Sequence, residues 1–293
     1  MSAKRRILLF AGFILVVATG LVAYSARKTD AEAVDATPTT VDPASQEQAE
    51  APMTLTDVLD LAREARAHLA NTLDDYTTRF VKQDRDQNGV LNEQEEMLMK
   101  VQTRVRGDAE NAPFRVYMKF LAPETKRGRE VIWGEDLNNG KLCVHEAGLL
   151  GLKRLNLEPT GFLAMQGQRY PISTVGMIRL VEKLIERGEQ DRDNPNITIE
   201  VVKDHQLGET TGELLQIHCS KPRGGENDFS LAEVVIDRER MLLLMFRSFG
   251  WPENEGEAAP LLESYTYHDV ETNVGLTDED FSPDNPEYNY PPF

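Results

Sequence analysis

The sequence predicts an α+β fold: one large, curved antiparallel sheet, an incomplete β-barrel, covered by two amphipathic helices. Three observations support it. A helical pattern of apolar residues opens the folded part, about five short segments with an alternating pattern follow, and a second helical pattern precedes about five more such segments. A sheet this wide has to curl, and its concave face then needs a cover. The two helices are the natural cover for that face.

Residues 54–73 are expected to form the first helix. Thr54, Thr56 or Asp57 supplies its N-cap. The apolar residues of this stretch recur at helical spacing, at Leu55, Val58, Ala62, Ala65 and Leu69. The pattern therefore indicates an amphipathic helix with one buried face.

After residue 75 the period of the pattern changes to two, which is typical of strands with one wet face. We expect a meander of antiparallel strands at 76–81, 99–106, 114–121, 129–133 and 141–145. The sequence Asn138-Asn139-Gly140 lies between the last two strands and favours a hairpin turn.

The middle of the chain interrupts this pattern. Prolines and glycines between residues 159 and 171 mark an irregular stretch. Ser173 or Thr174 is then expected to cap a second helix, which Gly188 ends. The wide apolar stripe of this helix consists of Met177, Ile178, Val181, Leu184 and Ile185.

Strands resume after the second helix. The alternating segments are 197–203, 213–219, 231–237, 241–249 and 261–270. The tail from residue 276 onward is rich in turn residues. We expect its aromatic side chains to pack on the sheet, namely Phe281, Tyr288, Tyr290 and Phe293.

Residues 1–26 form a membrane-targeting segment. Three basic residues at positions 4–6 precede an uncharged apolar run over 7–23, a pattern that directs export and leaves the basic head in the cytosol. A run of about 17–20 apolar residues is long enough to span a bilayer. We therefore favour a retained anchor in the inner membrane, with the domain on the periplasmic side. A signal peptide cleaved at the small residues 23–25, with release into the periplasm, is the alternative.

Residues 27–53 are rich in Ala, Thr, Asp, Glu, Gln and Pro and contain no aromatic residue. This composition is typical of a disordered tether. A single half-barrel domain over 54–293 is then the simplest organisation.

The chain is acidic, with 49 Asp and Glu against 32 Lys and Arg and a net charge of −17 at pH 7. Such a surface repels phosphate backbones and anionic headgroups, which argues against nucleic acid or a peripheral lipid surface as a partner. Cationic ligands, metal ions and basic protein patches remain open. Acidity that only keeps an exported protein soluble is the simpler interpretation.

Two cysteines, Cys143 and Cys219, lie in strand-like segments. An oxidising compartment permits a disulfide between them, and two small buried side chains are the alternative. A zinc site formed with His145 and His218 is disfavoured, because neighbours on a strand such as His218 and Cys219 point to opposite faces.

Residues 84–95 match the calcium-loop template D-x-[DN]-x-[DN]-G-x5-E. The candidate ligands are the side chains of Asp84, Asp86, Asn88, Asn92 and Glu95 and the carbonyl group of Val90. A loop of this kind is normally flanked by helices, whereas strands are expected on both sides here. We favour a bare hairpin turn at Asn88-Gly89. Calcium is the one cofactor that the sequence suggests.

Several short motifs stand out along the folded part, among them Pro113-Phe114, Gly128-Arg129-Glu130-Val131-Ile132, Arg169-Tyr170-Pro171-Ile172 and Tyr265-x-Tyr267. Together they resemble a bacterial exported family, domain of unknown function 1571, over about residues 55–290. That family is distantly similar to the lipoprotein-carrier superfamily, which sorts outer-membrane lipoproteins and folds as an incomplete antiparallel barrel with helices in its mouth. The resemblance implies a cavity that shelters an acyl chain or another apolar group, without an established activity.

Flexible or aliphatic side chains near the second helix and the mouth of the sheet are the candidates for lining such a cavity. They are Met118, Leu149, Leu150, Leu163, Met165, Met177, Ile178, Val181 and Leu184. Ordinary core packing is the alternative interpretation of the same residues.

We expect a non-enzymatic, membrane-tethered envelope protein that binds a lipid or a lipoprotein acyl chain. The five histidines are scattered, and none lies in a nucleophile or metalloprotease motif. The alternative is a calcium-modulated envelope scaffold or sensor that binds a protein partner.

Overall fold

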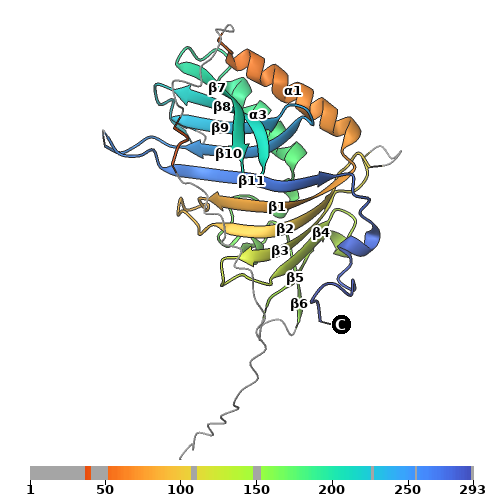
Figure 1. Cartoon of the computed structure of the whole chain (residues 1–293). Helices are drawn as coiled ribbons and strands as arrows, with labels where there is room; N and C mark the ends of the chain where they lie inside the picture. The colour runs from red at the N-terminus through yellow and green to blue at the C-terminus, as the bar shows by residue number, and fades with distance from the viewer. Residues whose placement is uncertain are drawn as a thin grey trace, which may run out of the picture. The chain divides into compact units, whose positions relative to one another are not determined.

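The computed structural model describes residues 37–40, 52–106, 111–147, 153–225, 228–254 and 256–291. Within them, eleven strands form one open antiparallel sheet (Figure 1). The strands are β1 (Asp75–Asp84), β2 (Glu95–Gln102), β3 (Arg115–Ala122), β4 (Glu130–Gly134), β5 (Leu142–His145), β6 (Arg154–Leu157), β7 (Ile197–Leu207), β8 (Thr210–Cys219), β9 (Leu231–Asp237), β10 (Leu242–Phe249) and β11 (Leu261–Thr272). The α+β fold class with one large antiparallel sheet is confirmed.

The sheet consists of two meanders that meet in its middle. Its strand order is β6-β5-β4-β3-β2-β1-β11-β10-β9-β8-β7, so the first strand of the chain pairs with the last. In this pairing Phe80 lies opposite Tyr267, and Lys82 lies opposite Tyr265. Side chains that are far apart in the sequence therefore meet at the centre of the sheet.

The strand predicted at 99–106 begins and ends earlier in the structure, where β2 spans Glu95–Gln102. Its pairing with β1 starts directly after the hairpin loop, where Glu95 lies opposite Lys82. The chain leaves the sheet at Thr103, whose hydroxyl group donates a hydrogen bond to the Leu73 carbonyl group. The short strand β6 was not predicted.

Helix α1 (Leu55–Thr72) begins with a capping box. The Thr54 hydroxyl accepts a hydrogen bond from the Asp57 N–H at 3.3 Å, and the Thr54 N–H donates to the Asp57 carboxylate at 2.8 Å. Thr54 is thus the N-cap among the three candidates. The fully buried residues of the helix are Leu59, Leu61, Ala65 and Leu69.

Helix α3 (Met177–Gln190) begins and ends differently from the prediction. Ser173 and Thr174 belong to a preceding 3-10 turn, and the N-cap is Gly176, whose φ of 111° favours glycine. Gly188 does not end the helix but lies inside it. A Cβ at this position would lie 2.8 Å from the Leu59 side chain, so glycine allows α1 and α3 to approach closely.

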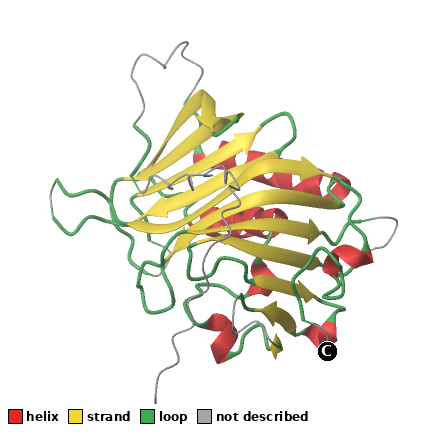
Figure 2. Cartoon of the chain, turned by 60° about the horizontal axis from the view of Figure 1, so that its bottom comes forward, coloured by secondary structure: helices red, strands yellow, loops and turns green. Residues whose placement is uncertain are grey.

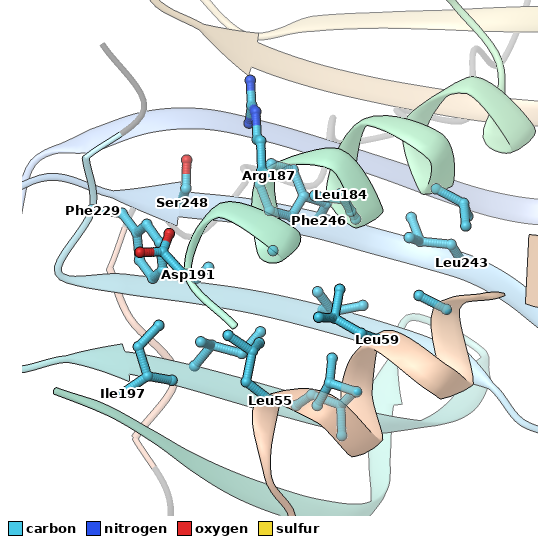
Figure 3. A pocket seen from close by; sticks show the side chains of 18 of the residues that line it. Leu55, Leu59, Leu184, Arg187, Asp191, Ile197, Phe229, Leu243, Phe246 and Ser248 are labelled. Carbon is cyan, nitrogen blue, oxygen red and sulfur yellow. The ribbon is translucent and has the colours of Figure 1, made fainter. Parts of the chain in front are cut away.

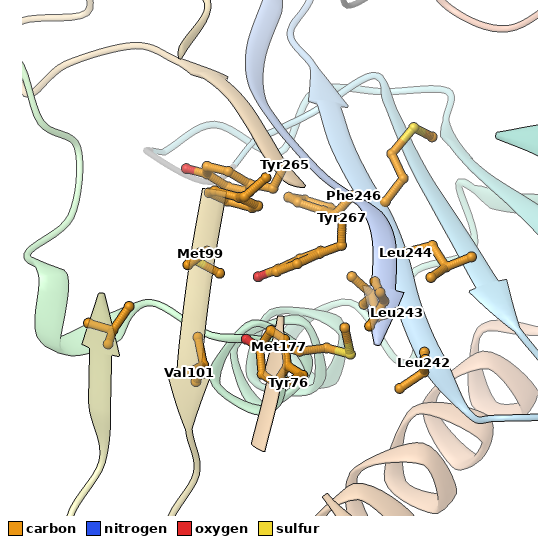
Figure 4. Packing of buried hydrophobic residues seen from close by; sticks show 14 of the residues in the cluster. Tyr76, Met99, Val101, Met177, Leu242, Leu243, Leu244, Phe246, Tyr265 and Tyr267 are labelled. Carbon is orange, nitrogen blue, oxygen red and sulfur yellow. The ribbon is translucent and has the colours of Figure 1, made fainter. Parts of the chain in front are cut away.

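Both long helices lie on one face of the sheet, the concave face (Figure 2). Tyr76 from β1, Met177 from α3 and Tyr267 from β11 meet in the core beneath them (Figure 4). The Met177 N–H donates to the Tyr76 hydroxyl oxygen at 3.1 Å, which fixes the start of α3 on the sheet. A four-residue helix, α2 (Phe162–Met165), lies in the connection before α3.

The tail covers the outer face of β3–β5, as predicted. Phe281 and Tyr290 are buried there, and the Tyr288 ring stacks on Tyr117 with 4.0 Å between ring centroids. Phe293 lies outside the described residues.

Residues 37–40, which belong to the predicted tether, contact the outer face of β8–β10. The Thr39 N–H donates to Glu233 at 2.9 Å, and its carbonyl group accepts from the Gln216 amide at 2.9 Å. The rest of the stretch 27–51 and the predicted membrane-targeting segment 1–26 lie outside the described residues. Among the residues that are described, no helix is both long and apolar enough to cross a bilayer.

Cys143 in β5 and Cys219 in β8 are free, buried thiols. The two strands lie near opposite ends of the sheet, whereas a disulfide needs a Cα separation of about 5.5 Å. A disulfide between them and a zinc site that joins both are therefore excluded in this fold.

Candidate ligand cavity

A cavity of about 550 Å³ lies on the concave face, between the sheet and the connection that leads from β6 into α3. This volume falls within the roughly 300–1,000 Å³ that is usual for small-molecule sites. The apolar residues of its lining include Phe80, Met97, Met118, Phe120, Val131, Leu142, Val144, Leu155, Leu157, Leu163, Ile172, Leu180, Tyr265 and Tyr267.

The sheet side of the cavity follows from the two-residue period of the strands. Strand β1 contributes Phe80 and Lys82, and β11 contributes Glu263, Tyr265 and Tyr267, each at every second position. The opposite faces of these strands carry Val81 and Ser264, which do not line the cavity. The alternation places both aromatic and charged side chains on the concave face.

The other side of the cavity has a different origin. It is formed by residues of the connection 158–176 and by one stripe of α3, consisting of Leu180, Lys183 and Arg187. These three positions share one helix face because they are three or four residues apart. The predicted cover of two helices is thus present, but over this half of the sheet α3 presents only one stripe.

A buried carboxylate, Glu263, organises the polar part of the lining. Its side chain is 3% exposed and accepts hydrogen bonds from Arg187 at 2.7 Å, Tyr265 at 3.1 Å and Tyr170 at 3.3 Å. Burial raises the pKa of Tyr265 well above its ordinary value, and the nearby Glu263 adds to this rise. Tyr265 is therefore a neutral hydrogen-bond donor at the cavity wall.

A second cluster of charged side chains lies where β1 ends and β2 begins. Lys82 Nζ is 3.7 Å from Asp84 and 3.3 Å from Glu95, and Lys126 also contacts Glu95. Burial tends to raise the pKa of Glu95, but the two lysines outweigh it and lower the pKa. Glu95 is therefore ionised and held by two cations.

This pairing bears on the calcium template, because Asp84 and Glu95 are its first and last ligands. Both line the cavity and contact lysines. At the tip, Asp86 accepts hydrogen bonds from the Asn88 and Val90 N–H groups at 2.8 and 3.0 Å, and its own N–H donates to the Val90 carbonyl group at 2.9 Å. Asn92 donates to Asp84 at 3.1 Å. The loop is a hairpin between two strands, and a calcium site here stays a prediction.

The predicted lining residues are divided among several surroundings. Met118 and Leu163 line the cavity. Val181 and Leu184 instead line a smaller hollow, while Met177 and Ile178 line a more polar groove near Phe114. The apolar stripe of α3 is wide and faces three surroundings, which explains the division. Met165 is half-buried in α2, and Leu149 and Leu150 lie outside the described residues.

The smaller hollow, of about 120 Å³, lies between α1, α3 and strands β8–β10 (Figure 3). Leu59 from α1, Leu184 from α3 and Phe246 from β10 line it. Arg187 and Glu263 border both this hollow and the large cavity. Their ion pair thus stands between the two.

Residues that sequence reasoning missed are Tyr170, Lys183, Arg187 and Glu263. Lys183 and Arg187 are four residues apart on the polar side of a helical pattern, which favours a solvated face. Their place at the cavity depends on the pairing of β1 with β11, which brings Glu263 to the centre of the sheet. In the sequence, the motif Arg169-Tyr170 was the signal that could have indicated Tyr170 as a site residue.

Fold and cavity together define the class: an open antiparallel half-barrel with a cavity under a helix and a connecting segment. The chain belongs to the family described as protein of unknown function DUF1571, which matches residues 73–290. This confirms the resemblance that the sequence motifs predicted. Among curated proteins, no match to this chain is found.

Solved structures with similar folds are known from several bacteria. A chain of the MucA/MucB complex of Pseudomonas aeruginosa is 16% identical with a TM-score of 0.40, and the match covers 76% of this chain and 60% of that one. A putative outer membrane lipoprotein-sorting domain from Vibrio parahaemolyticus is 11% identical with a TM-score of 0.33, covering 76% and 95%. A LolA superfamily protein from Nitrosomonas europaea is 10% identical with a TM-score of 0.27, covering 78% and 98%.

Proposed function

We propose that this protein is a non-enzymatic binding protein of the cell envelope that holds an apolar ligand, a lipid or the acyl chain of a lipoprotein, in its half-barrel cavity. The observation that carries this proposal is the cavity of about 550 Å³ with a largely apolar lining. Each methylene group that moves from water into such a lining contributes about 0.8 kcal/mol. A chain of several methylene groups therefore gains enough free energy to bind.

The chemistry of the lining supports binding rather than catalysis. Among the described residues, the lining contains no histidine and no cysteine. Its carboxylates are engaged by cations, as Glu95 is by two lysines and Glu263 is by Arg187. The two lysines lower the pKa of Glu95, which makes it a weaker general base near neutral pH.

The location is proposed from the first 26 residues. A retained anchor would hold the domain on the periplasmic side of the inner membrane, and a cleaved signal would release it into the periplasm. Either outcome places the cavity between two membranes, where an apolar molecule in transit needs shelter from water. The acidic charge argues against nucleic acid as a partner.

The proposal is tested by filling the cavity. Val144 points into it from β5, whereas Val274 is 42% exposed and lies outside the lining. We expect Val144→Trp to weaken binding of a fluorescent fatty acid by tenfold or more, and the matched Val274→Trp to leave it unchanged. Circular dichroism and thermal unfolding confirm that both variants fold.

A second measurement uses the natural ligand. Native mass spectrometry of protein purified from its own host should detect co-purified lipid, and Val144→Trp should carry less of it. A wild-type protein that carries no lipid and binds no fatty acid would contradict the proposal.

A further inference from the structure

The charge of the cavity lining differs from that of the whole protein. The lining holds five cations against four carboxylates, whereas the chain carries a net charge of −17. The cations are Lys82, Lys126, Arg129, Lys183 and Arg187, and the carboxylates are Asp84, Glu95, Glu146 and Glu263. The cavity lining therefore carries a small net positive charge in a protein whose net charge is strongly negative.

Four of the five cations are already paired. Lys82 and Lys126 contact Glu95, Arg129 lies 2.9 Å from Glu146, and Arg187 lies 2.7 Å from Glu263. These pairs neutralise each other within the wall of the cavity. They leave one cation of the lining to account for.

Lys183 is that cation. Within the described part of the chain, no carboxylate lies within ion-pair distance of its ammonium group and no hydrogen-bond acceptor contacts it. Its Nζ atom lies over the Tyr170 ring, 3.6 Å from the ring centroid. A cation–π contact leaves the N–H donors of the ammonium group available to an incoming anion.

The surroundings of Lys183 favour an anion. Burial, and then the charge of Arg187 one turn along α3, lower the pKa of Lys183 below its ordinary value. Its positive charge is therefore costly at this partly buried place in the cavity wall. An anion that pairs with the ammonium group removes this cost, and a charge-assisted hydrogen bond at a partly buried site is stronger than one in water.

We propose that the cavity selects amphiphiles with an anionic head, a carboxylate or a phosphate, which Lys183 binds while the apolar lining of β1–β3 receives the chain. This inference rests on the proposed function and names the class of ligand. Lys183 lies near Glu263 of β11, whereas Phe80, Met97 and Met118 lie on β1, β2 and β3. Strands are about 4.8 Å apart, so the way from β11 to β3 is about 14 Å, which an extended acyl chain of a dozen carbons can span.

The test compares four amphiphiles with the same chain: dodecanoate, dodecyl phosphate, dodecanol and dodecyltrimethylammonium. Their affinities are measured by displacement of a fluorescent probe from the full exported domain. Three variants are compared with the wild type: Lys183→Met, which keeps the apolar stem, Lys183→Arg, which keeps the charge, and Lys221→Met, which removes an exposed lysine outside the lining.

For the wild type we expect at least one of the two anions to bind about tenfold more tightly than dodecanol, with the cation weakest. Lys183→Met should abolish this preference and leave dodecanol binding unchanged. Lys183→Arg and Lys221→Met should retain it. The order of dodecanoate and dodecyl phosphate then distinguishes a fatty acid from a phospholipid as the source of the head.

Equal affinities of the wild type for dodecanol and both anions would overturn the inference and leave the proposed function intact. A Lys183→Met variant that loses dodecanol and dodecanoate binding equally would also overturn it. Failure of all four amphiphiles to bind the wild type would instead contradict the proposed function.

Discussion

The two halves of the concave face are covered in different ways. Over β8–β10, helices α1 and α3 pack on the sheet and leave a hollow of about 120 Å³. Over β1–β5, the cover is the connection 158–176 with one stripe of α3, and about 550 Å³ remains open. Two packed helices fill a curved sheet because their side chains interdigitate with it, whereas an irregular connection offers few side chains to do so.

The difference assigns separate roles to the two halves. The helix-covered half holds the deeply buried residues of α1 and the close approach of α1 to α3 at Gly188. The other half holds more of the charged lining groups and the larger open volume. Stability should therefore respond mainly to substitutions in the first half, and ligand binding mainly to those in the second.

The largest expected effect is on stability. Leu69 of α1 is 1% exposed in the helix-covered half, and Leu180 of α3 borders the open cavity. We expect Leu69→Ala to lower the free energy of unfolding by about 2–5 kcal/mol, because it leaves a void in a packed core. The matched Leu180→Ala should cost less than about 1 kcal/mol, since its side chain already faces open space. Urea unfolding followed by circular dichroism measures both values, and equal losses would contradict the division.

Gly188 gives the next largest effect. Gly188→Ala places a methyl group 2.8 Å from the Leu59 side chain, so either this side chain or α1 has to shift. We expect a loss of about 1–3 kcal/mol from overpacking, although alanine is the better helix former. Leu59→Ala in the same molecule should recover part of this loss in a double-mutant cycle. A Gly188→Ala variant that is more stable than the wild type would show that the helices do not approach closely.

The pH dependence of anion binding is a third expectation. The groups that act on Lys183 are Arg187 and Glu186 of α3, Glu263 of β11, and Arg169 of the connection. Since the pKa of Lys183 is lowered, its positive charge is fully present below that pKa and is lost as the pH rises through it. As the pH rises, the preference for dodecyl phosphate over dodecanol should therefore decrease, and it should begin to do so before the pH reaches 10.4, the ordinary pKa of lysine.

The matched control for this titration is Lys183→Arg, whose guanidinium group stays charged throughout. Displacement assays between pH 7 and 10 should show a falling preference for the wild type and a constant one for this variant. Parallel curves for the two proteins would exclude Lys183 as the group that titrates.

The smallest expected effect concerns calcium. Lys82 and Lys126 hold Asp84 and Glu95, so calcium would have to displace both lysines to use the first and last ligands of the template. We expect calorimetric titration to show no saturable heat up to about 1 mM calcium, the weak limit for extracellular sites. A saturable heat that Asp86→Asn abolishes would establish the calcium site after all.

Local sequence patterns predicted where the helices and strands lie better than they predicted which elements pair or pack together. The two-residue period placed β9 at its observed bounds and β11 within two residues, because alternation depends on neighbouring residues alone. Thr54 was among the predicted caps because a threonine directly before a helical pattern is a local signal. Strand β6 spans four residues directly before the irregular stretch that prolines and glycines mark, and it was not predicted. The start of α3 depends on a glycine conformation rather than on the polar residues Ser173 and Thr174.

The site was predicted in part for the same reason. Met118 and Leu163 are apolar and line the cavity. Val181 and Leu184 have the same chemistry, yet face the hollow beside α1, because the packing of α1 against α3 decides which stripe of the helix meets which surface. Glu263 and Lys183 come together only through the pairing of the first strand with the last, which no local pattern reveals.

A crystal structure with 12-bromododecanoic acid distinguishes the two halves most directly, because the anomalous signal of bromine locates the end of the chain. We expect one bromine peak in the cavity beside Met118 of β3, and a carboxylate within hydrogen-bond distance of Lys183. A bromine peak between α1 and α3, or none in a crystal of protein that binds the acid in solution, would contradict this account of the cavity.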